Sequence, residues 1–311
     1  MLDEKIRELL REFENEGIQP RYTLPVSEVR RLSTEMVKRF AVLRPNLASV
    51  RDIFADVKNA RIPVRVYVPR EQRRLPVLVY YHGGGWVVGN LETADWLCRS
   101  LALAADCVIF SIDYRLAPEY KFPTPAEDCY QAAKWVPENG FERYADVSRL
   151  AVGGDSAGGN LATVVCLMAR DRGDPVVSYQ LLICPVTNHS FETESYHQYA
   201  DGYLLTLKDM QWFWNHYLRQ PRDGENAYAS PLLGDLHSLP RALVITAEYD
   251  PLRDEGEAYA KRLQDAGVVT SMTRYDSMIH CFTDFADLKQ TREAIDEAAY
   301  QLRSAFAARP V

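Results

Sequence analysis

The sequence has no block rich in lysine or arginine. It contains 36 Lys and Arg residues against 43 Asp and Glu residues, which gives a formal net charge of -7 at pH 7. Nucleic acids and anionic membranes attract proteins through clustered positive charge. We therefore expect neither as a partner of this chain.

Long apolar runs are also missing. The longest have the length of a core strand, as at residues 77–81, whereas a membrane helix needs about 20 apolar residues. Residues 1–17 mix charged and apolar residues at helical spacing, so they lack the apolar core of a signal peptide. These features predict a soluble, cytoplasmic protein.

The six cysteines form no C-x-x-C pair and mostly lie inside apolar stretches, which favours reduced, buried thiols over disulfides or a zinc site. There is no internal repeat, low-complexity stretch or Gly/Ser linker. Hydrophobic residues make up 47% of the chain, enough for a sizeable core. One domain is the simplest expectation.

From Asp52 onward, short β-rich runs alternate with helical patterns, which is typical of a parallel sheet with crossover helices. Eight strands are predicted, and the first two should form an antiparallel pair. They cover residues 53–57, 62–68, 77–81, 107–112, 150–153, 179–184, 243–247 and 270–275. Helices are predicted near residues 92–105, 124–135, 157–170, 252–266 and 287–307.

Two segments fall outside this alternation. Residues 1–50 predict two helices, one ending near Gly17 and one beginning at a Ser27 N-cap. The second helix has four apolar residues on one face, namely Val29, Leu32, Met36 and Phe40. Residues 186–225 form an aromatic-rich insertion between the sixth and seventh strands. We expect both segments to form a helical cap on a catalytic domain of residues 51–311, with helical packing inside that domain as the alternative.

Residues 150–160 predict a strand, a sharp turn and an apolar-periodic helix. The turn reads Gly154-Asp155-Ser156-Ala157-Gly158, the G-x-S-x-G pattern in the context that a nucleophilic serine requires. Its two glycines remove side chains that would collide, and the helix N-terminus favours negative charge beside Ser156. Taken alone, the pentapeptide has a second interpretation, a glycine-rich turn that caps a structural helix.

A second motif, His82-Gly83-Gly84-Gly85-Trp86, directly follows the third predicted strand. Acyl transfer passes through a tetrahedral oxyanion, and residues without side chains let backbone N–H groups approach its oxygen. Glycines of this motif and Ala157 are the predicted donors. A phosphate-binding loop is disfavoured because neither G-K-[ST] nor G-x-G-x-x-G follows.

The acid and the base should follow late strands, in the chain order Ser, Asp or Glu, His. Asp250 follows the seventh predicted strand and His280 the last. Asp254 and Glu248 are the alternatives for the acid. Asp254 should lie within the next helix, and Glu248 precedes the bend in the chain that follows the seventh strand. Among the other histidines, His82 should hold the glycine loop by hydrogen bonding. The rest are expected to be surface or structural residues: His189, His197, His216 and His237.

Four segments resemble the hormone-sensitive-lipase family of esterases: HGGGW at 82–86, DYRLAPE at 113–119, GDSAG at 154–158 and DPLRDEG at 250–256, together with His280. The resemblance runs from about residue 52 to the end of the chain. It implies an α/β-hydrolase fold with an eight-stranded, mostly parallel sheet flanked by helices, a helical cap, and no metal or organic cofactor.

The resemblance also implies hydrolysis of short- to medium-chain acyl esters by the triad Ser156, Asp250 and His280. It selects Gly84 and Gly85, with Ala157, as the oxyanion hole. It further implies a homodimer through the last strand, residues 270–275.

One residue departs from the family pattern, because Cys281 stands where glycine commonly follows the catalytic histidine. A thiol is small, so the triad should survive. We interpret Cys281 as structural rather than nucleophilic, since no second base or resolving cysteine lies beside it. Redox modulation through this thiol stays open.

The predicted substrate-binding residues are Trp86 of the glycine motif and three residues of the insertion: Leu205, Met210 and Phe213. They belong to a wider apolar and aromatic set that could close an acyl pocket, with core packing as the alternative for each. Small soluble esters are the expected substrates. The same machinery could serve amides, thioesters or one acetylated metabolite, while an inactive ligand receptor should have lost a triad member.

Overall fold

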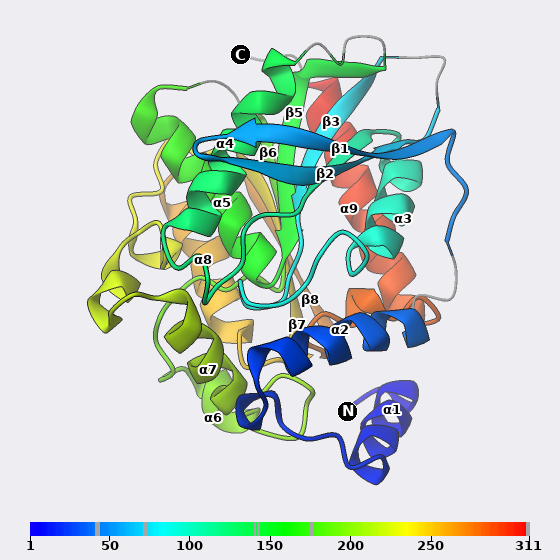
Figure 1. Cartoon of the computed structure of the whole chain (residues 1–311), viewed down its shortest axis with the longest axis vertical. Coiled ribbons are helices and arrows are strands. Elements are labelled where there is room, and N and C mark those ends of the chain that lie inside the picture. The colour runs from blue at the N-terminus through cyan, green and yellow to red at the C-terminus, as the bar shows by residue number, and fades with distance from the viewer. Residues whose placement is uncertain (41–43, 71–73, 140, 142–143, 175–176, 309–311) are drawn as a thin grey trace.

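A single mixed sheet of eight strands organises the chain, in the order β1-β2-β4-β3-β5-β6-β7-β8 (Figure 1). The computed structural model describes residues 1–40, 44–70, 74–139, 141, 144–174 and 177–308, apart from the side chains of residues 37, 38 and 40. Strand β1 pairs antiparallel with β2, and β2 with β4, whereas the other neighbours are parallel. The predicted opening antiparallel pair and the eight-stranded, mostly parallel sheet are confirmed.

The strands are β1 (Ser49–Val57), β2 (Ala60–Val68), β3 (Leu75–Tyr81), β4 (Val108–Ile112), β5 (Ala145–Asp155), β6 (Tyr179–Ile183), β7 (Arg241–Tyr249) and β8 (Thr270–Ile279). The crossover helices are α3 (Asp95–Ala105), α4 (Thr124–Glu138), α5 (Ala157–Arg172), α8 (Arg253–Asp265) and α9 (Lys289–Ala307). Each predicted strand and crossover helix overlaps one of these elements.

Both faces of the sheet are buried, as the alternation of β3 shows. Val77 and Val79 point into a core shared with α4, α5 and α8, whereas Leu78 and Tyr80 point into a second core with α3 and α9. A central strand that is apolar on both faces needs helices on both sides, because each fully buried large apolar side chain contributes about 1.5–3 kcal/mol.

Six of the strands extend beyond their predicted bounds, and β5 and β8 show why. Strand β5 begins five residues early, because its first part carries the half-exposed or exposed Asp146, Ser148 and Arg149 and so offers no apolar run. Strand β8 continues to Ile279 through Ser277, which has a positive φ of 70°. Polar and irregular strand ends give little periodic signal.

The N-terminal residues form α1 (Glu4–Asn15), the 3₁₀ helix η1 (Arg21–Thr23) and α2 (Val26–Phe40). The predicted Ser27 N-cap is wrong. Helix α2 begins one residue earlier, and the carbonyl of Pro25 accepts from the N–H groups of Glu28 and Val29 at 3.0 and 3.1 Å. Proline precedes a helix well because it has no N–H to leave unpaired. The side chain predicted at position 40 lies outside the described residues.

Residues 186–225 carry α6 (Glu194–Gln198), α7 (Leu207–Tyr217) and η3 (Pro221–Glu225). Helices α1, α2, α6 and α7 gather beyond one end of the sheet (Figure 1). The N-terminal segment contacts this insertion directly, because Arg21 Nη1 lies 3.4 Å from both Leu204 O and Asp209 Oδ2. Two further 3₁₀ helices, η4 (Pro231–Leu233) and η5 (Phe282–Asp284), lie in loops. Among the described helices, none combines the length and apolarity that a membrane crossing requires.

Candidate active site

Ser156 lies on a sharp turn between β5 and α5. Its backbone has φ 54° and ψ -120°, a strained conformation for a residue with a side chain. The turn is tight because a Cβ on Gly158 would lie 1.9 Å from the carbonyl oxygen of Tyr81. The N–H of Ser156 donates to Ile183 O at 2.8 Å. Strand, turn and helix therefore fix the serine at the end of the sheet where β3, β5 and β6 terminate.

Two later loops bring a histidine and an aspartate to this serine. His280 Nε2 lies 2.9 Å from Ser156 Oγ, and His280 Nδ1 lies 2.7 Å from Asp250 Oδ2. The other oxygen of Asp250 accepts from the N–H of Leu252 at 2.8 Å. Ser156 and His280 are each 6% exposed and Asp250 is fully buried. The three residues thus form a continuous, nearly dry chain of hydrogen bonds.

The alternative acids are engaged elsewhere. Asp254 Oδ2 accepts from the N–H of Ser195 at 2.7 Å, and Glu248 Oε2 accepts from the N–H of Ser277 at 2.7 Å. Asp250 alone of the three carboxylates is placed against His280 Nδ1. With the imidazole neutral, this contact holds the proton on Nδ1 and leaves Nε2 free to accept from the serine hydroxyl.

The glycine motif forms a loop directly after β3. Gly84 and Gly85 have positive φ angles of 110° and 57°, and a Cβ on Gly85 would lie 2.2 Å from the ring of Phe213. The N–H of Gly83 is already used, because it donates to Asp155 Oδ1 at 3.1 Å. This is a structural reason to place Gly84 and Gly85, rather than Gly83, at a developing oxyanion.

Asp155 is a functional residue that sequence reasoning missed. Its Oδ1 accepts from the hydroxyl of Tyr80 at 2.7 Å as well as from Gly83. Burial raises the pKa of Asp155, while the hydrogen bond from Tyr80 opposes that rise. The residue occupies the variable second position of G-x-S-x-G, so the pattern itself gives no reason to single it out.

His82 lies inside the glycine loop. Its Nδ1 is 2.8 Å from Gly83 O, and its ring stacks on that of Tyr114 with centroids 4.4 Å apart. Burial lowers the pKa of His82 to about 4, so the imidazole is neutral at pH 7. Two other histidines bond within their own segments: His216 Nδ1 lies 2.8 Å from Trp212 O, and His237 Nδ1 lies 2.7 Å from Asp235 Oδ1.

A cavity of about 760 Å³ contains Ser156 and His280 in its wall. Leu205, Met210 and Phe213, which the sequence predicted as substrate-binding residues, line this cavity. The structure places Trp86 elsewhere. Its ring is fully buried, stacks on that of Tyr217 with centroids 4.1 Å apart and lies tilted against that of Trp214 at 4.6 Å, so it supports the wall from behind.

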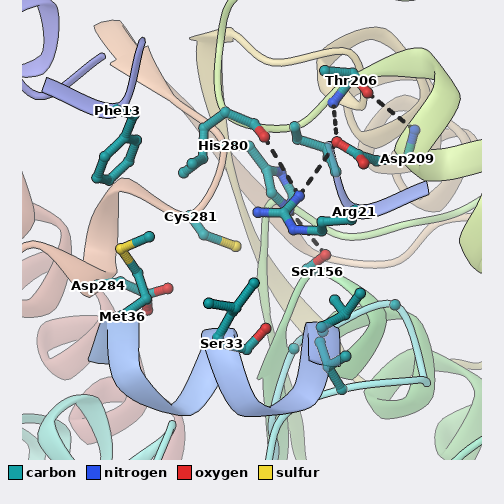
Figure 2. Close-up of a pocket in the computed structure, with 18 of the residues that line it drawn as sticks. Phe13, Arg21, Ser33, Met36, Ser156, Thr206, Asp209, His280, Cys281 and Asp284 are labelled. Carbon is teal, nitrogen blue, oxygen red and sulfur yellow. Dashed lines mark hydrogen bonds and ion pairs between the residues drawn. The ribbon is translucent and has the colours of Figure 1, made fainter. Parts of the chain in front are cut away.

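The N-terminal helices supply much of the remaining wall. Figure 2 shows Phe13, Arg21, Ser33 and Met36 around Ser156. Their spacing predicts amphipathic helices but not the element that an apolar face will cover, so sequence reasoning left them out of the site. Only the fold brings residues more than a hundred positions apart to the same cavity.

Of the two thiols near the triad, Cys184 is buried and Cys281 is partly exposed. The six cysteines are free, and burial raises the pKa of both Cys184 and Cys281 well above the ordinary value. Cys281 has φ 51°, in the left-handed region that favours glycine. Among the described residues, Cys184, Asp250 and His280 bring one potential metal-binding atom each within 4.8 Å of one another. A protonated thiol beside an already bonded Asp–His pair is a poor metal site.

Comparisons with known proteins agree with this geometry. A family described as having the alpha/beta hydrolase fold matches residues 78–284. An arylesterase of Saccharolobus solfataricus is 36% identical over 283 residues, covering 90% of this chain and 92% of that protein. An ethyl acetate hydrolase of Pseudomonas putida is 36% identical over 287 residues, covering 90% and 89%.

A solved structure of a hyperthermophilic esterase from Pyrobaculum calidifontis superposes with a TM-score of 0.93 at 45% identity, covering 98% of this chain and 99% of that one. The sheet, the turn at the serine and these relatives lead to one assignment. The chain belongs to the hormone-sensitive-lipase-like family of α/β-hydrolase-fold carboxylesterases.

Proposed function

We propose that this carboxylic ester hydrolase acts on small, soluble esters with short- to medium-length acyl chains, through an acyl-enzyme on Ser156. The observation that carries the proposal is the hydrogen-bonded chain from Asp250 through His280 to Ser156, which ends in the wall of a cavity beside the glycine loop. Relatives named arylesterase and ethyl acetate hydrolase support the reaction class.

Acylation begins when His280 Nε2 takes the proton of Ser156 Oγ and the oxygen attacks the ester carbonyl carbon. The N–H groups of Gly84, Gly85 and Ala157 stabilise the resulting oxyanion, where one such donor is worth about 3 kcal/mol. The intermediate collapses as the bond to the alcohol oxygen breaks. The alcohol leaves with the proton that His280 held.

Deacylation repeats the sequence with water. His280 takes a proton from the water molecule, whose oxygen attacks the acyl carbon, and the second tetrahedral intermediate releases the carboxylic acid and returns the proton to Ser156. Asp250 remains ionised throughout and stabilises the imidazolium that forms twice. Its burial and fixed position make that interaction effective.

The cavity wall supports the proposed substrate size. Residues 1–50 and 186–225 act as the cap in this proposal, because Phe13 and Met36 from one segment and Met210 and Phe213 from the other line the same cavity. A largely apolar cavity with walls from both cap segments favours a soluble ester over a triglyceride at an interface. Amide or thioester substrates are the second candidate, since the triad chemistry is shared and the leaving group is read by pocket shape.

Hydrolysis of a chromogenic ester series from acetyl to long acyl, with mass spectrometry after organophosphate treatment, tests this proposal. We expect turnover to peak at a short chain, with one adduct on Ser156 and no turnover by folded Ser156→Ala. An adduct without ester turnover would point to the amide or thioester alternative. Absence of both would overturn the proposal and favour a ligand receptor.

We also propose a homodimer through β8, as the family resemblance implies. This strand is the last of the sheet, and Val269 beside it and Met272 within it are 63% and 44% exposed. An unpaired edge with exposed apolar residues is suited to pairing with a second copy. Light scattering coupled to size exclusion should give a dimer that Met272→Lys weakens. A monomer at all concentrations would contradict the proposal.

A further inference from the structure

The glycine loop is tied to the nucleophile at its start. The N–H of Gly83 donates to Oδ1 of Asp155, the neighbour of Ser156 in the chain, at 3.1 Å. Gly84 and Gly85, the proposed oxyanion donors, follow with positive φ angles and no side chains to hold them in place. The direction of their N–H groups therefore depends on backbone contacts further along the loop.

Backbone hydrogen bonds fix the peptide unit between Gly84 and Gly85. This planar unit carries both the carbonyl of Gly84 and the N–H of Gly85, so holding one of them orients the other. Gly84 O accepts from the N–H of Val87 at 3.1 Å and from the N–H of Val88 at 2.9 Å. The direction of the Gly85 N–H thus depends on where Val87 and Val88 lie.

The peptide unit between Val87 and Val88 is held in turn by Arg30 of α2. Its N–H donates to Gly84 O, and its carbonyl, Val87 O, accepts from Arg30 Nε at 2.8 Å. A continuous path of two hydrogen bonds and two planar peptides therefore runs from the guanidinium to the Gly85 N–H. Hydrogen bonds in such a chain polarise one another, and a cation at one end makes the N–H at the other end a stronger donor.

A second arm of the same side chain reaches the DYRLAPE segment. Arg30 Nη2 donates to Ala117 O at 2.9 Å, and the N–H of Ala117 donates to Trp86 O at 2.9 Å. The carboxylate oxygens of Glu119 accept from Nη1 and Nη2 at 2.9 and 2.7 Å. A guanidinium suits this place because its planar fork of N–H groups serves several acceptors in fixed directions. The DYRLAPE segment thereby supports the glycine loop and holds Arg30 against it.

Helix α2 also contributes to the substrate cavity. Ser33 and Met36 of this helix line the cavity that contains Ser156 (Figure 2). Arg30 does not belong to the described residues of the cavity wall, and its side chain is 31% exposed. An effect of Arg30 on the reaction must therefore pass through the backbone that it holds.

We propose that Arg30 is a positioning residue that sets the oxyanion hole from the cap, by orienting the Gly84–Gly85 peptide through Val87. The proposal rests on the function proposed above, which places the oxyanion at the N–H groups of Gly84 and Gly85. Helix α2 then has two tasks, because some of its residues line the substrate cavity while Arg30 completes the support of the glycine loop. Catalytic competence is thereby linked to docking of the N-terminal segment.

Three substitutions separate this role from simple docking of the helix. Arg30→Lys keeps the positive charge opposite Glu119 but loses the fork that reaches both carbonyls. Glu119→Gln removes the ion pair and leaves both carbonyl contacts of Arg30 in place. Arg31→Lys is the matched control, because Arg31 is the next residue of α2 and pairs with two glutamates of the same helix at 2.7 and 2.6 Å.

A pair of ketones measures the oxyanion hole directly. A trifluoromethyl ketone adds to Ser156: the bond from Oγ to the carbonyl carbon forms, the carbonyl π bond breaks, the serine proton passes to His280, and the ketone oxygen becomes an oxyanion in the hole. The methyl ketone with the same alkyl chain occupies the cavity without adding. The ratio of the two inhibition constants therefore reports on the hole, whereas a change in the cavity wall affects both ketones and cancels.

The variants are compared after circular dichroism has shown that each is folded. With a short chromogenic ester, Arg30→Lys should lower kcat about tenfold and change KM by less than about twofold. It should weaken the trifluoromethyl ketone relative to the methyl ketone by a similar factor. Glu119→Gln should lower kcat by less than about threefold, because a partly exposed ion pair contributes little, and Arg31→Lys should match the wild type.

Two results would overturn the inference. One is a kcat and a ketone ratio in Arg30→Lys that both stay within about twofold of the wild type. The other is equal weakening of both ketones together with a raised KM, which would assign Arg30 to docking of the helix alone. A wild type that hydrolyses no ester would instead overturn the proposed function. The ketone ratio would still decide on Arg30 in that case, because it requires only the activated serine.

Discussion

Removal of the Asp155 carboxylate should damage catalysis without touching the triad. Its Oδ1 holds the N–H of Gly83 at 3.1 Å and the hydroxyl of Tyr80 at 2.7 Å. Asp155→Ala leaves both donors without that acceptor. The glycine loop then loses the contact that ties it to the turn at Ser156, so Gly84 and Gly85 no longer have a fixed position relative to the nucleophile.

The size of the effect follows from these two contacts. Misplacement of one oxyanion donor costs about a hundredfold in kcat, or about 3 kcal/mol of transition-state stabilisation. The buried hydroxyl of Tyr80 without its acceptor should lower the free energy of unfolding by about 1–3 kcal/mol. Because the oxyanion exists only in the transition state and the intermediates, kcat should fall while KM changes little.

Steady-state hydrolysis of a short chromogenic ester gives kcat and KM, and urea unfolding gives the stability. Asp155→Asn serves as the matched variant, because its amide oxygen can still accept from Gly83 and Tyr80 while the charge is gone. It should retain activity within about tenfold of the wild type. A folded Asp155→Ala protein with kcat within threefold of the wild type would refute the positioning role. Equal losses in both variants would assign the effect to charge instead.

Three further changes test the fold around the site. Gly158→Ala places a Cβ 1.9 Å from Tyr81 O, so it should destabilise the protein by about 3 kcal/mol in urea unfolding, and an unaffected midpoint would contradict the tight turn. Arg21→Ala breaks the ion pair with Asp209 and should raise KM severalfold. Its effect on the free energy of unfolding should stay below about 1 kcal/mol, because the Arg21 side chain is 32% exposed. An unchanged KM would argue against a role of Arg21 in the wall of the substrate cavity. His82 has a pKa of about 4 in the folded protein against 6.5 ordinarily, so the unfolded state binds more protons between these values and stability should fall by about 3 kcal/mol as pH drops through this window. His82→Gln should remove that slope and keep substantial ester turnover, and a nearly inactive variant would reopen the choice of base.

The fold and the reacting residues are the parts that sequence reasoning reaches best. Each strand of the sheet combines a short apolar run with a following turn or helix signal, and the chain order of Ser156, Asp250 and His280 limits where an acid and a base can lie. The structure brings these three side chains within hydrogen-bond distance of one another. Local pattern and chain order were sufficient because each residue sits where a parallel strand ends.

The cavity wall is harder to predict, because it depends on which faces meet across long separations in the chain. Trp86 illustrates the difficulty. It follows the three glycines that are predicted to hold the oxyanion, so a place in the substrate pocket was expected for its ring. The backbone of Trp86 instead has a positive φ of 61°, and its ring is buried against Tyr217. Met36 shows the converse, since an apolar residue on an N-terminal helix becomes part of the substrate cavity. Neither outcome follows from residue type or spacing.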